Sequence, residues 1–159
     1  MFRAGDKIVH PLHGAGVIEE IVERTIDGES AKYYALKLAL DDVVLFLPVD
    51  NCETLGIRPV CSKKQAEELL NQLDELARSE DKGWNQRYRE NMLRIRSGDL
   101  VEVAQVIKNL AEREKERGLS TGEKKMLLSA RQIIESEVAF ALGKTTEQAG
   151  KLINERLCI

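Results

Sequence analysis

The segment KGWNQRYRENMLRIR, residues 82–96, contains the only tryptophan of the chain and four of its arginines. If it forms a helix, successive residues turn by about 100°, and four apolar side chains share one face: Trp84, Tyr88, Met92 and Ile95. Two arginines lie on each flank of this face. An indole ring beside arginines can insert at a base step in the minor groove of DNA while the cations contact phosphates.

Trp84 admits two interpretations. An apolar stripe at helical spacing is usually the core-facing side of a helix, so periodicity alone favours a buried Trp84. However, Trp84 directly follows Gly83 at the expected first turn, where a ring can point outward. The free backbone N–H groups of a first turn also attract phosphates. The sequence leaves both interpretations open.

Two lysines, Lys124 and Lys125, occur in GEKKML, residues 122–127. This segment lacks the glycine spacing of a phosphate-binding P-loop. Ser120 and Glu123 instead form a capping-box pattern, which predicts the first turn of a helix. The two lysines are candidates for contacts with a phosphate backbone.

No pattern in the chain indicates an enzyme. His10 and His13 are two ligands where a structural zinc needs four, and Pro11, Gly14 and Gly16 around them indicate a turn. The sequence has no P-loop, dinucleotide fingerprint or Ser/His/Asp arrangement. We therefore expect no catalytic residues, no metal site, no cofactor and no small-molecule substrate.

The elements that must position these residues change type near residue 60. Residues 1–60 contain short runs rich in β-branched and aromatic residues, bounded by glycine, proline, asparagine and aspartate. Such runs predict four or five strands. Alternation in residues 31–40 predicts one buried face, with turns at DGES, residues 27–30, and at the acidic pair Asp41–Asp42. Strands this short indicate a small bent sheet or barrel of the SH3 or Tudor kind.

Residues 61–159 have helical periodicity, so the predicted fold is α+β with two modules: a small N-terminal β-barrel and a bundle of about five helices. LGIRPVCS, residues 55–62, is expected to join the modules. RSEDKG, residues 78–83, is expected to be a polar hinge before the tryptophan helix.

Local signals predict where these helices begin and end. Capping boxes at Ser62–Gln65 and Ser120–Glu123 each open a helix. Gly98 closes the tryptophan helix and Asp99 caps the next one. The last helix begins at Thr145 or Thr146 and ends near Leu157.

Charge and composition restrict the kind of partner. The 159-residue chain has a formal charge of −3, with six basic and ten acidic residues in residues 1–60 against eighteen and seventeen in residues 61–159. Any contact with nucleic acid must therefore be local. No apolar run approaches the ~20 residues that span a bilayer, no secretory signal is visible, and three scattered cysteines indicate reduced thiols. We expect a cytoplasmic protein without a membrane partner.

Several longer motifs occur in order along the chain. They are GDKIVHPLHGAGVIEEI, RTIDGES, YY and LPVDN in the N-terminal half, then RYREN after the tryptophan, SGDLVEVAQVIKNL and ERGLSTGEKKML. Taken in this order, the motifs resemble the CarD/CdnL family of bacterial RNA polymerase-binding transcription factors. The resemblance covers nearly the whole chain. It implies a Tudor-like domain over residues 1–60 that binds the polymerase β subunit, and a helical domain over residues 61–159 that binds promoter DNA.

The resemblance also implies roles for particular residues. Trp84 would insert into the minor groove at the upstream edge of the transcription bubble and change the stability of the open promoter complex, with DNA contacts from Arg87, Arg89 and Lys124. Lys125 remains a candidate for a DNA contact from its charge alone. On the polymerase side, the implied contact residues are Arg24, Ile26, Phe46, Leu47 and Pro48. Phe46 departs from the family pattern, because some members have a basic residue there. The protein would then be nucleoid-associated through polymerase.

A second hypothesis is an adaptor that binds polymerase or a repair translocase and makes no functional DNA contact. Such an adaptor needs no tryptophan flanked by arginines, and this feature distinguishes the two hypotheses.

Overall fold

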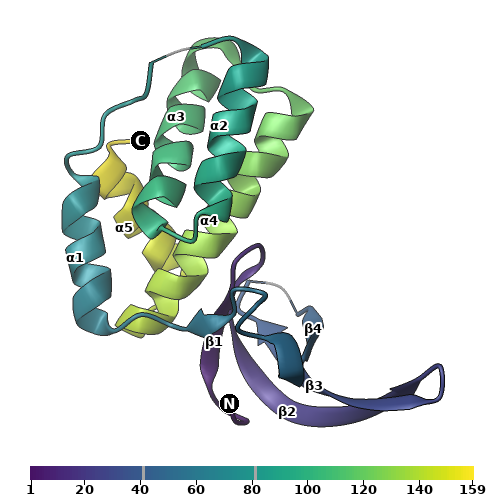
Figure 1. Ribbon diagram of the computed structural model, residues 1–159. Helices are drawn as coiled ribbons and strands as arrows, with labels where there is room; N and C mark the ends of the chain where they lie inside the picture. The colour runs from purple at the N-terminus through teal and green to yellow at the C-terminus, as the bar shows by residue number, and fades with distance from the viewer. Residues whose placement is uncertain (41, 81) are drawn as a thin grey trace.

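Five antiparallel strands form the N-terminal sheet in the computed structural model, which describes residues 1–40, 42–80 and 82–159 (Figure 1). The order across the sheet is β4-β3-β2-β1-β5. The strands are β1 (Lys7–His10), β2 (Gly14–Ile26), β3 (Glu29–Leu38), β4 (Val44–Pro48) and β5 (Arg58–Pro59). The edge strands β4 and β5 are not paired with each other in this described part, so the small bent sheet has two edges.

One face of the sheet encloses a small core, as the alternation in residues 31–40 predicts. Tyr34, Leu36 and Leu38 of β3 are buried with Ile8 and Ile18. The Asp27–Gly28 turn is also confirmed, since both residues have positive φ, 52° and 81°, as a two-residue hairpin turn requires. Asp41 and Asp81, in the predicted acidic turn and polar hinge, lie outside the described residues.

The β2–β3 hairpin extends beyond the rest of the sheet. Pro48, the last residue of β4, lies opposite Tyr33 of β3, while β2 and β3 stay paired as far as Ile26 and Glu29. Residues 23–32 therefore form a two-stranded ribbon that projects from the sheet, visible on the right of Figure 1. This ribbon and the open edge of β4 are the most accessible parts of the N-terminal module.

Five helices follow the sheet in the described residues, which confirms the predicted α+β arrangement of two modules. They are α1 (Lys63–Leu73), α2 (Trp84–Arg96), α3 (Leu100–Arg117), α4 (Thr121–Leu142) and α5 (Thr146–Leu157). No helix in the described part of the chain is long and apolar enough to cross a membrane.

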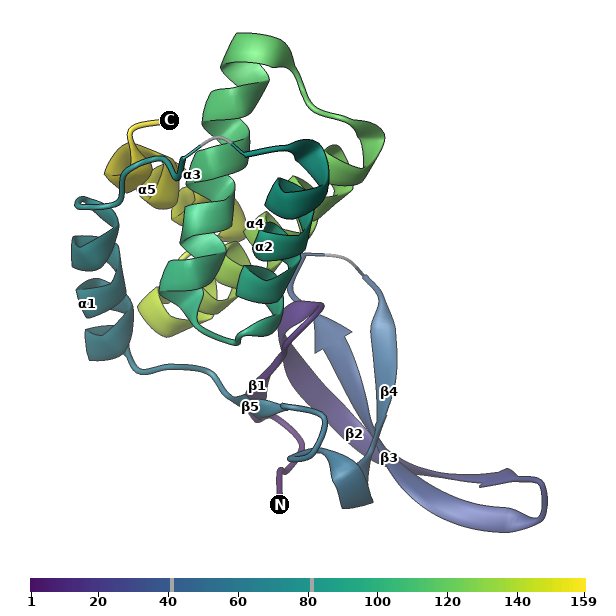
Figure 2. The same ribbon diagram turned by 45° about the horizontal axis from the view of Figure 1, so that its top comes forward.

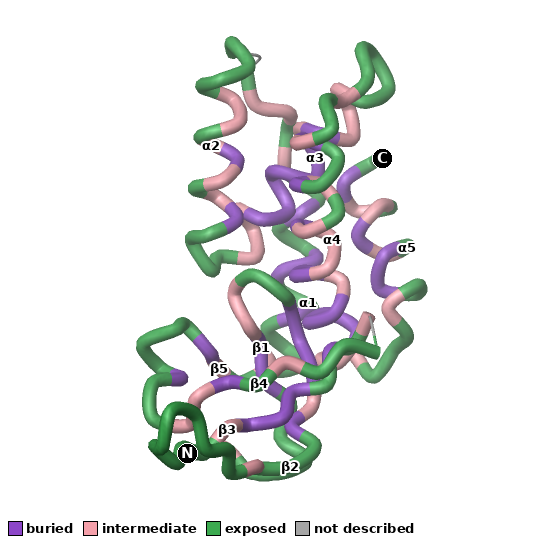
Figure 3. The backbone as a smooth tube through the Cα atoms, turned by 90° about the vertical axis from the view of Figure 1, so that its right-hand side faces the viewer, coloured by how far each residue is buried: buried purple, intermediate pink, exposed green. Residues whose placement is uncertain are grey.

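The predicted helix ends are confirmed by side-chain hydrogen bonds. Ser62 with Gln65 and Ser120 with Glu123 form complete capping boxes. The Asp99 carboxylate accepts a hydrogen bond from the Val101 N–H. Between the two alternatives for the last helix, Thr145 is the N-cap. The apolar sides of the helices enclose a second core, seen as the buried stretches in Figure 3.

The two modules pack directly against each other. The segment expected only to join them contains β5, which pairs with β1, and α4 lies against β1 and β2 (Figures 1 and 2). At Gly14 the backbone of β2 comes close to α4. A Cβ atom there would lie 2.5 Å from Ser136 Oγ and 2.7 Å from the Gln132 carbonyl oxygen, and its φ is +85°.

We expect Gly14→Ala to destabilise the protein more than Gly28→Ala does. Both glycines have positive φ, but a Cβ at Gly28 would have nothing within 4 Å. Gly28→Ala therefore adds only backbone strain of about 1–2 kcal/mol. Gly14→Ala adds about 1–3 kcal/mol more for overpacking against α4. Urea unfolding of the two variants measures the difference. Equal midpoints would show that α4 can shift to accommodate the added methyl group at little cost in stability.

Candidate functional site

Trp84 is the first residue of α2 and is not part of the core. The residue is 46% exposed, so the interpretation that periodicity favoured is wrong for this side chain. Its ring stacks on Tyr88, with ring centroids 5.0 Å apart and planes inclined by 19°. Its Nε1–H donates to Ser120 Oγ at 3.3 Å. Tyr88 and Ser120 therefore hold the indole in one orientation while nearly half of the residue's surface remains open.

The remainder of the predicted stripe does face the core. Ile95 is buried, and Tyr88 and Met92 pack against the core of the helical module. The stripe thus becomes less buried toward the start of the helix, and Trp84 is its exposed end. The physical reason is the position of α2, whose first turn lies beside the first turn of α4 at the rim of the bundle (Figure 2).

Arg87 links the starts of α2 and α4. Its Nε donates to Glu123 Oε2 at 3.0 Å, and its Nη1 donates to the Lys82 carbonyl at 2.9 Å. The Arg87 side chain is only 12% exposed. Arg87 therefore makes contacts within the protein and positions the helix that begins with Trp84, which argues against the predicted phosphate contact.

Glu123 serves both the capping box and the Arg87 pair. Burial acts to raise the pKa of its carboxyl, but the hydrogen bond and charge of Arg87, with hydrogen bonds from Ser120, outweigh burial and hold that pKa below its ordinary value. A carboxyl whose pKa is lower in the folded chain stabilises the fold at neutral pH. This contribution is lost as the pH falls below the ordinary value of 4.5.

Glu123→Gln is therefore expected to weaken the dependence of stability on acid pH. Wild type should lose unfolding free energy as the pH falls through the lowered pKa of Glu123, and the variant should lose less of it. Urea unfolding at neutral and acid pH measures this difference. Glu147→Gln is the control, because Glu147 forms only an exposed pair with Lys151. Equal pH profiles for wild type and Glu123→Gln would contradict the expectation.

Three of the predicted DNA-binding cations are exposed on the two helices whose first turns meet at Trp84. Arg89 lies on α2, and Lys124 and Lys125 lie in the first turn of α4. Close approach of the helices brings them together, because a Cβ at Gly122 would lie 3.4 Å from the Tyr88 ring. The adjacent ends of α2 and α4 thus carry an exposed aromatic ring, three exposed cations and two helix starts. Positive helix termini and cations both favour an anionic partner.

The predicted polymerase contacts lie on β4 and the ribbon. The Val43 carbonyl accepts a hydrogen bond from the Leu38 N–H of β3 at 3.1 Å. Because hydrogen-bonding direction alternates along an antiparallel strand, the N–H and C=O groups of Val44 and Phe46 point away from β3. The edge of β4 is therefore open to a further strand.

Side chains on this edge differ in how accessible they are. Phe46 is 43% exposed, and the guanidinium of Arg24 lies over its ring at 4.1 Å from the centroid. Ile26 is exposed near the tip of the ribbon. Leu47 is only 6% exposed and belongs to the core of the sheet, which argues against the predicted polymerase contact of its side chain. Pro48 is half-buried, and its carbonyl accepts a hydrogen bond from the Cys52 thiol.

Comparison with known proteins agrees with this arrangement. Residues 2–61 match the CarD-like/TRCF RID domain, and residues 68–154 match the CarD C-terminal domain. The chain belongs to the CarD family. It therefore carries the two domains of a CarD-family transcription factor, and its RID domain is an RNA polymerase-interacting module. Over 148 residues it is 32% identical to YdeB of Bacillus subtilis (strain 168), a candidate transcription factor, covering 93% of this chain and 97% of that protein.

The histidine pair of this CarD-family protein supports the turn between β1 and β2. The rings of His10 and His13 lie 4.6 Å apart, and His10 Nδ1 accepts a hydrogen bond from the Leu12 N–H at 3.0 Å. Burial and the nearby His13 lower the pKa of His10. Within the described ranges, no group of three or more His, Cys, Asp or Glu side chains could hold a metal ion.

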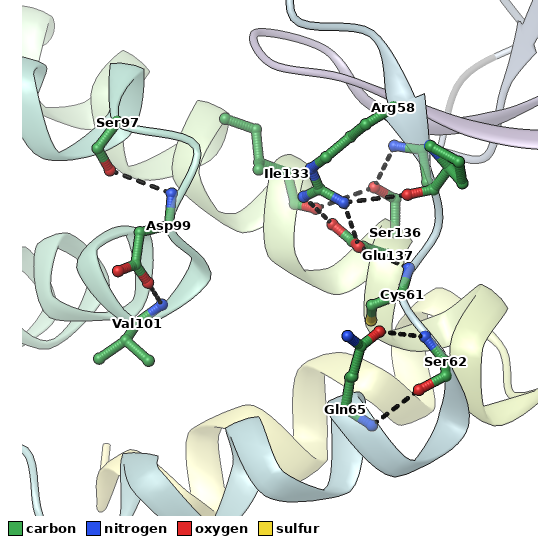
Figure 4. A network of polar contacts seen from close by, with 12 residues as sticks. Arg58, Cys61, Ser62, Gln65, Ser97, Asp99, Val101, Ile133, Ser136 and Glu137 are labelled. Atoms are coloured by element: carbon green, nitrogen blue, oxygen red, sulfur yellow. Dashed lines mark hydrogen bonds and ion pairs between the residues drawn. The ribbon is translucent and has the colours of Figure 1, made fainter.

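Sequence reasoning missed a polar cluster between the two CarD-family domains. Glu137 of α4 accepts hydrogen bonds from both Nη atoms of Arg58 and from the Cys61 N–H (Figure 4). The partners are 79 and 76 residues away along the chain, so no local spacing could reveal them. The available signal was helical spacing, because Glu137 follows Ile133 and Ile134 by four and three residues and so shares their apolar face of α4.

Proposed function

We propose that this CarD-family protein regulates transcription initiation by holding two partners at once. The N-terminal module binds the β subunit of RNA polymerase, and the helical module binds promoter DNA at the upstream edge of the transcription bubble. The observation that carries the proposal is the exposed Trp84 ring, which Tyr88 and Ser120 hold in place beside the exposed cations of α2 and α4.

On the DNA side, Trp84 fills a base step that has lost its stacking partner. Base–aromatic stacking is worth about 1–3 kcal/mol and tolerates any sequence. Arg89, Lys124 and Lys125 contact phosphates and hold the helix in register, and these contacts weaken as salt rises. Arg87 acts through Glu123 and does not touch DNA. A ligand shifts an equilibrium only by its differential affinity for the two states, and only the open complex offers an unstacked step to the ring.

On the polymerase side, the open edge of β4 adds to a strand of the β subunit. Strand addition uses backbone hydrogen bonds for affinity and neighbouring side chains for specificity. Val44 and Phe46 supply the backbone groups, while Phe46, Arg24 and Ile26 supply exposed side-chain surface. The ring of Phe46 under the Arg24 guanidinium makes this contact partly apolar and partly cationic.

This function requires no catalysis, cofactor, small-molecule substrate or membrane. It places the protein in the cytoplasm, associated with the nucleoid through polymerase. Its two attachments also fit the acidic overall charge, because the polymerase contact raises the effective concentration of the DNA-binding rim. The protein alone then needs only weak affinity for duplex DNA.

Photocrosslinking tests the proposal directly. A benzoylphenylalanine in place of Asn85, an exposed residue beside Trp84, is irradiated in open complexes of bacterial polymerase on one promoter. The expected crosslinks map to the DNA at the upstream edge of the bubble. An adaptor without a DNA contact would crosslink only to protein, and that outcome would replace this proposal with the second hypothesis.

Val44→Pro tests the polymerase contact. Proline lacks an N–H group, and the N–H of Val44 points to the open edge, so the sheet itself loses no hydrogen bond. We expect about tenfold weaker binding to the purified β subunit, the size of one lost interfacial hydrogen bond. Val44→Thr keeps the N–H and is the control. Unchanged affinity of a folded Val44→Pro variant would show that β4 does not add to a strand of polymerase.

A further inference from the structure

The contact between the two modules is polar and directional, and it joins a buried carboxylate to an arginine whose side chain is 38% exposed. Glu137 is 0% exposed. Its Oε1 lies 2.6 Å from Arg58 Nη2 and its Oε2 lies 2.7 Å from Arg58 Nη1, while Oε2 also accepts from the Cys61 N–H at 3.0 Å. A bidentate arginine–carboxylate pair restricts both distance and angle. Arg58 belongs to β5 and Glu137 to α4, so this pair sets how the sheet is turned on the helix (Figure 4).

Two further contacts join other strands to the same helix. The Ala15 N–H of β2 donates to Ser136 Oγ at 2.8 Å, next to the close approach at Gly14. The Lys7 ammonium of β1 lies over the Phe140 ring, 5.4 Å from its centroid. Residues 136–140 of α4 therefore contact three strands. A single contact would permit rotation about it, whereas three contacts at different points do not.

We propose that Arg58 and Glu137 are positioning residues that hold the two modules in one orientation, so that docking on polymerase presents Trp84 to a single base step. The proposal rests on the function proposed above and specifies how its two attachments are coupled. If the orientation of the modules is fixed, the distance between the β4 edge and Trp84 is fixed as well. The step that receives the ring is then set by polymerase and by this distance.

The choice of an ion pair with a buried carboxylate supports this role. Burying a carboxylate costs desolvation free energy, and apolar residues of the same volume often stabilise a protein as well or better. A bidentate pair with a third hydrogen bond adds what apolar packing lacks, which is a defined direction. Because the orientation is set before binding, no conformational entropy of the two modules is lost when both partners bind.

The double variant Arg58→Gln/Glu137→Gln separates orientation from folding. It removes both charges together, so neither is left buried and unpaired. Asp74→Asn/Arg156→Gln is the matched control, because this pair joins α1 and α5 within the helical module at 2.8 Å. Gly14→Ala is an independent way to disturb the contact, since it pushes on Gln132 and Ser136 without changing a charge.

The first measurement is the orientation of the modules in the full chain. Residual dipolar couplings of the ¹⁵N-labelled protein should fit one alignment tensor for both modules in wild type and in the control. Two tensors are expected for Arg58→Gln/Glu137→Gln and for Gly14→Ala.

Alkylation of Cys61 provides a second readout of the contact between the modules. Burial and the nearby Glu137 raise the pKa of its thiol to about 11, so it should react slowly in wild type and faster once the contact opens. Two tensors for wild type would overturn the proposal.

The second measurement is made on open complexes with polymerase. Arg58→Gln/Glu137→Gln should bind the β subunit as tightly as wild type does. Its effect on open-complex lifetime should be about tenfold smaller than that of wild type, because avidity falls when the geometry no longer favours binding to both partners at once. Its crosslinks from position 85 should spread from one base step to several, which loss of stability alone would not cause. The double variant could show two tensors and still have the wild-type effect on lifetime and crosslink to a single base step. That result would overturn the positioning role while the proposed function stands. If the wild-type protein does not change the lifetime of the open complex, both the positioning role and the proposed function are wrong.

Discussion

Trp84→Ala is expected to shorten the lifetime of open promoter complexes while leaving polymerase binding unchanged. The lost stacking is worth about 1–3 kcal/mol, or about 5- to 150-fold in the equilibrium between closed and open complexes. The protein itself should remain folded, because the residue is 46% exposed and its one side-chain hydrogen bond is to a capping serine at the surface. Dissociation of polymerase from one promoter, challenged with competitor DNA, measures the effect.

Two comparisons make this result specific to the ring. Trp84→Phe keeps an aromatic ring and should retain part of the effect. Leu93→Ala removes another exposed apolar side chain from α2, 63% exposed, and should change nothing. If Trp84→Ala lengthens the lifetime as much as wild type does, Trp84 does not insert into DNA, and the activity belongs to the polymerase-binding module.

Glu137→Ala is expected to cost the largest amount of stability among single substitutions at a polar residue. Arg58 loses its carboxylate partner, the Cys61 N–H loses its acceptor, and a cavity remains in the contact between the modules. Breaking a fully buried ion pair from one side typically costs about 3–5 kcal/mol. Because the Arg58 side chain is 38% exposed, water can solvate it after the substitution, and we expect a loss of about 1–3 kcal/mol. Urea unfolding, followed by circular dichroism, measures the loss of unfolding free energy.

The control for this prediction is Glu102→Ala. Glu102 pairs with Arg94 at 2.7 Å, but both side chains are substantially exposed, and such pairs are worth about 0–1 kcal/mol. The two substitutions remove the same chemical group from one ion pair each, so burial is the main difference. If both variants unfold at the same urea concentration, the Arg58–Glu137 pair contributes no more than a surface pair, and its role would be limited to orientation.

The sequence by itself determined the local elements of this protein. Each capping box joins residues three apart, and the Asp27–Gly28 turn depends on two neighbours. These structures follow from short segments because their hydrogen bonds close within one turn of chain. The change of periodicity near residue 60 likewise predicted a sheet followed by helices. The ordered motifs identified the family without any knowledge of packing.

Only the tertiary structure decided which side of each element is exposed at the site. Periodicity places Trp84 on the apolar face of α2 but does not say how far the bundle covers that face. Alternation puts Phe46 and Leu47 on opposite faces of β4, but not which face is inward. The short strand has apolar residues on both faces, so its pattern is symmetrical. The fold buries Leu47 and exposes Phe46.

The partners of the charged residues were also decided by packing. Arg87 meets Glu123 across 36 residues, and Arg58 meets Glu137 across 79. An exposed arginine and a buried one have the same sequence signature, because the energetic difference comes from the solvent that the fold removes. The sequence thus determined which residues could bind DNA or polymerase. The tertiary structure decided which of them remain free to do so and how the two modules are held together.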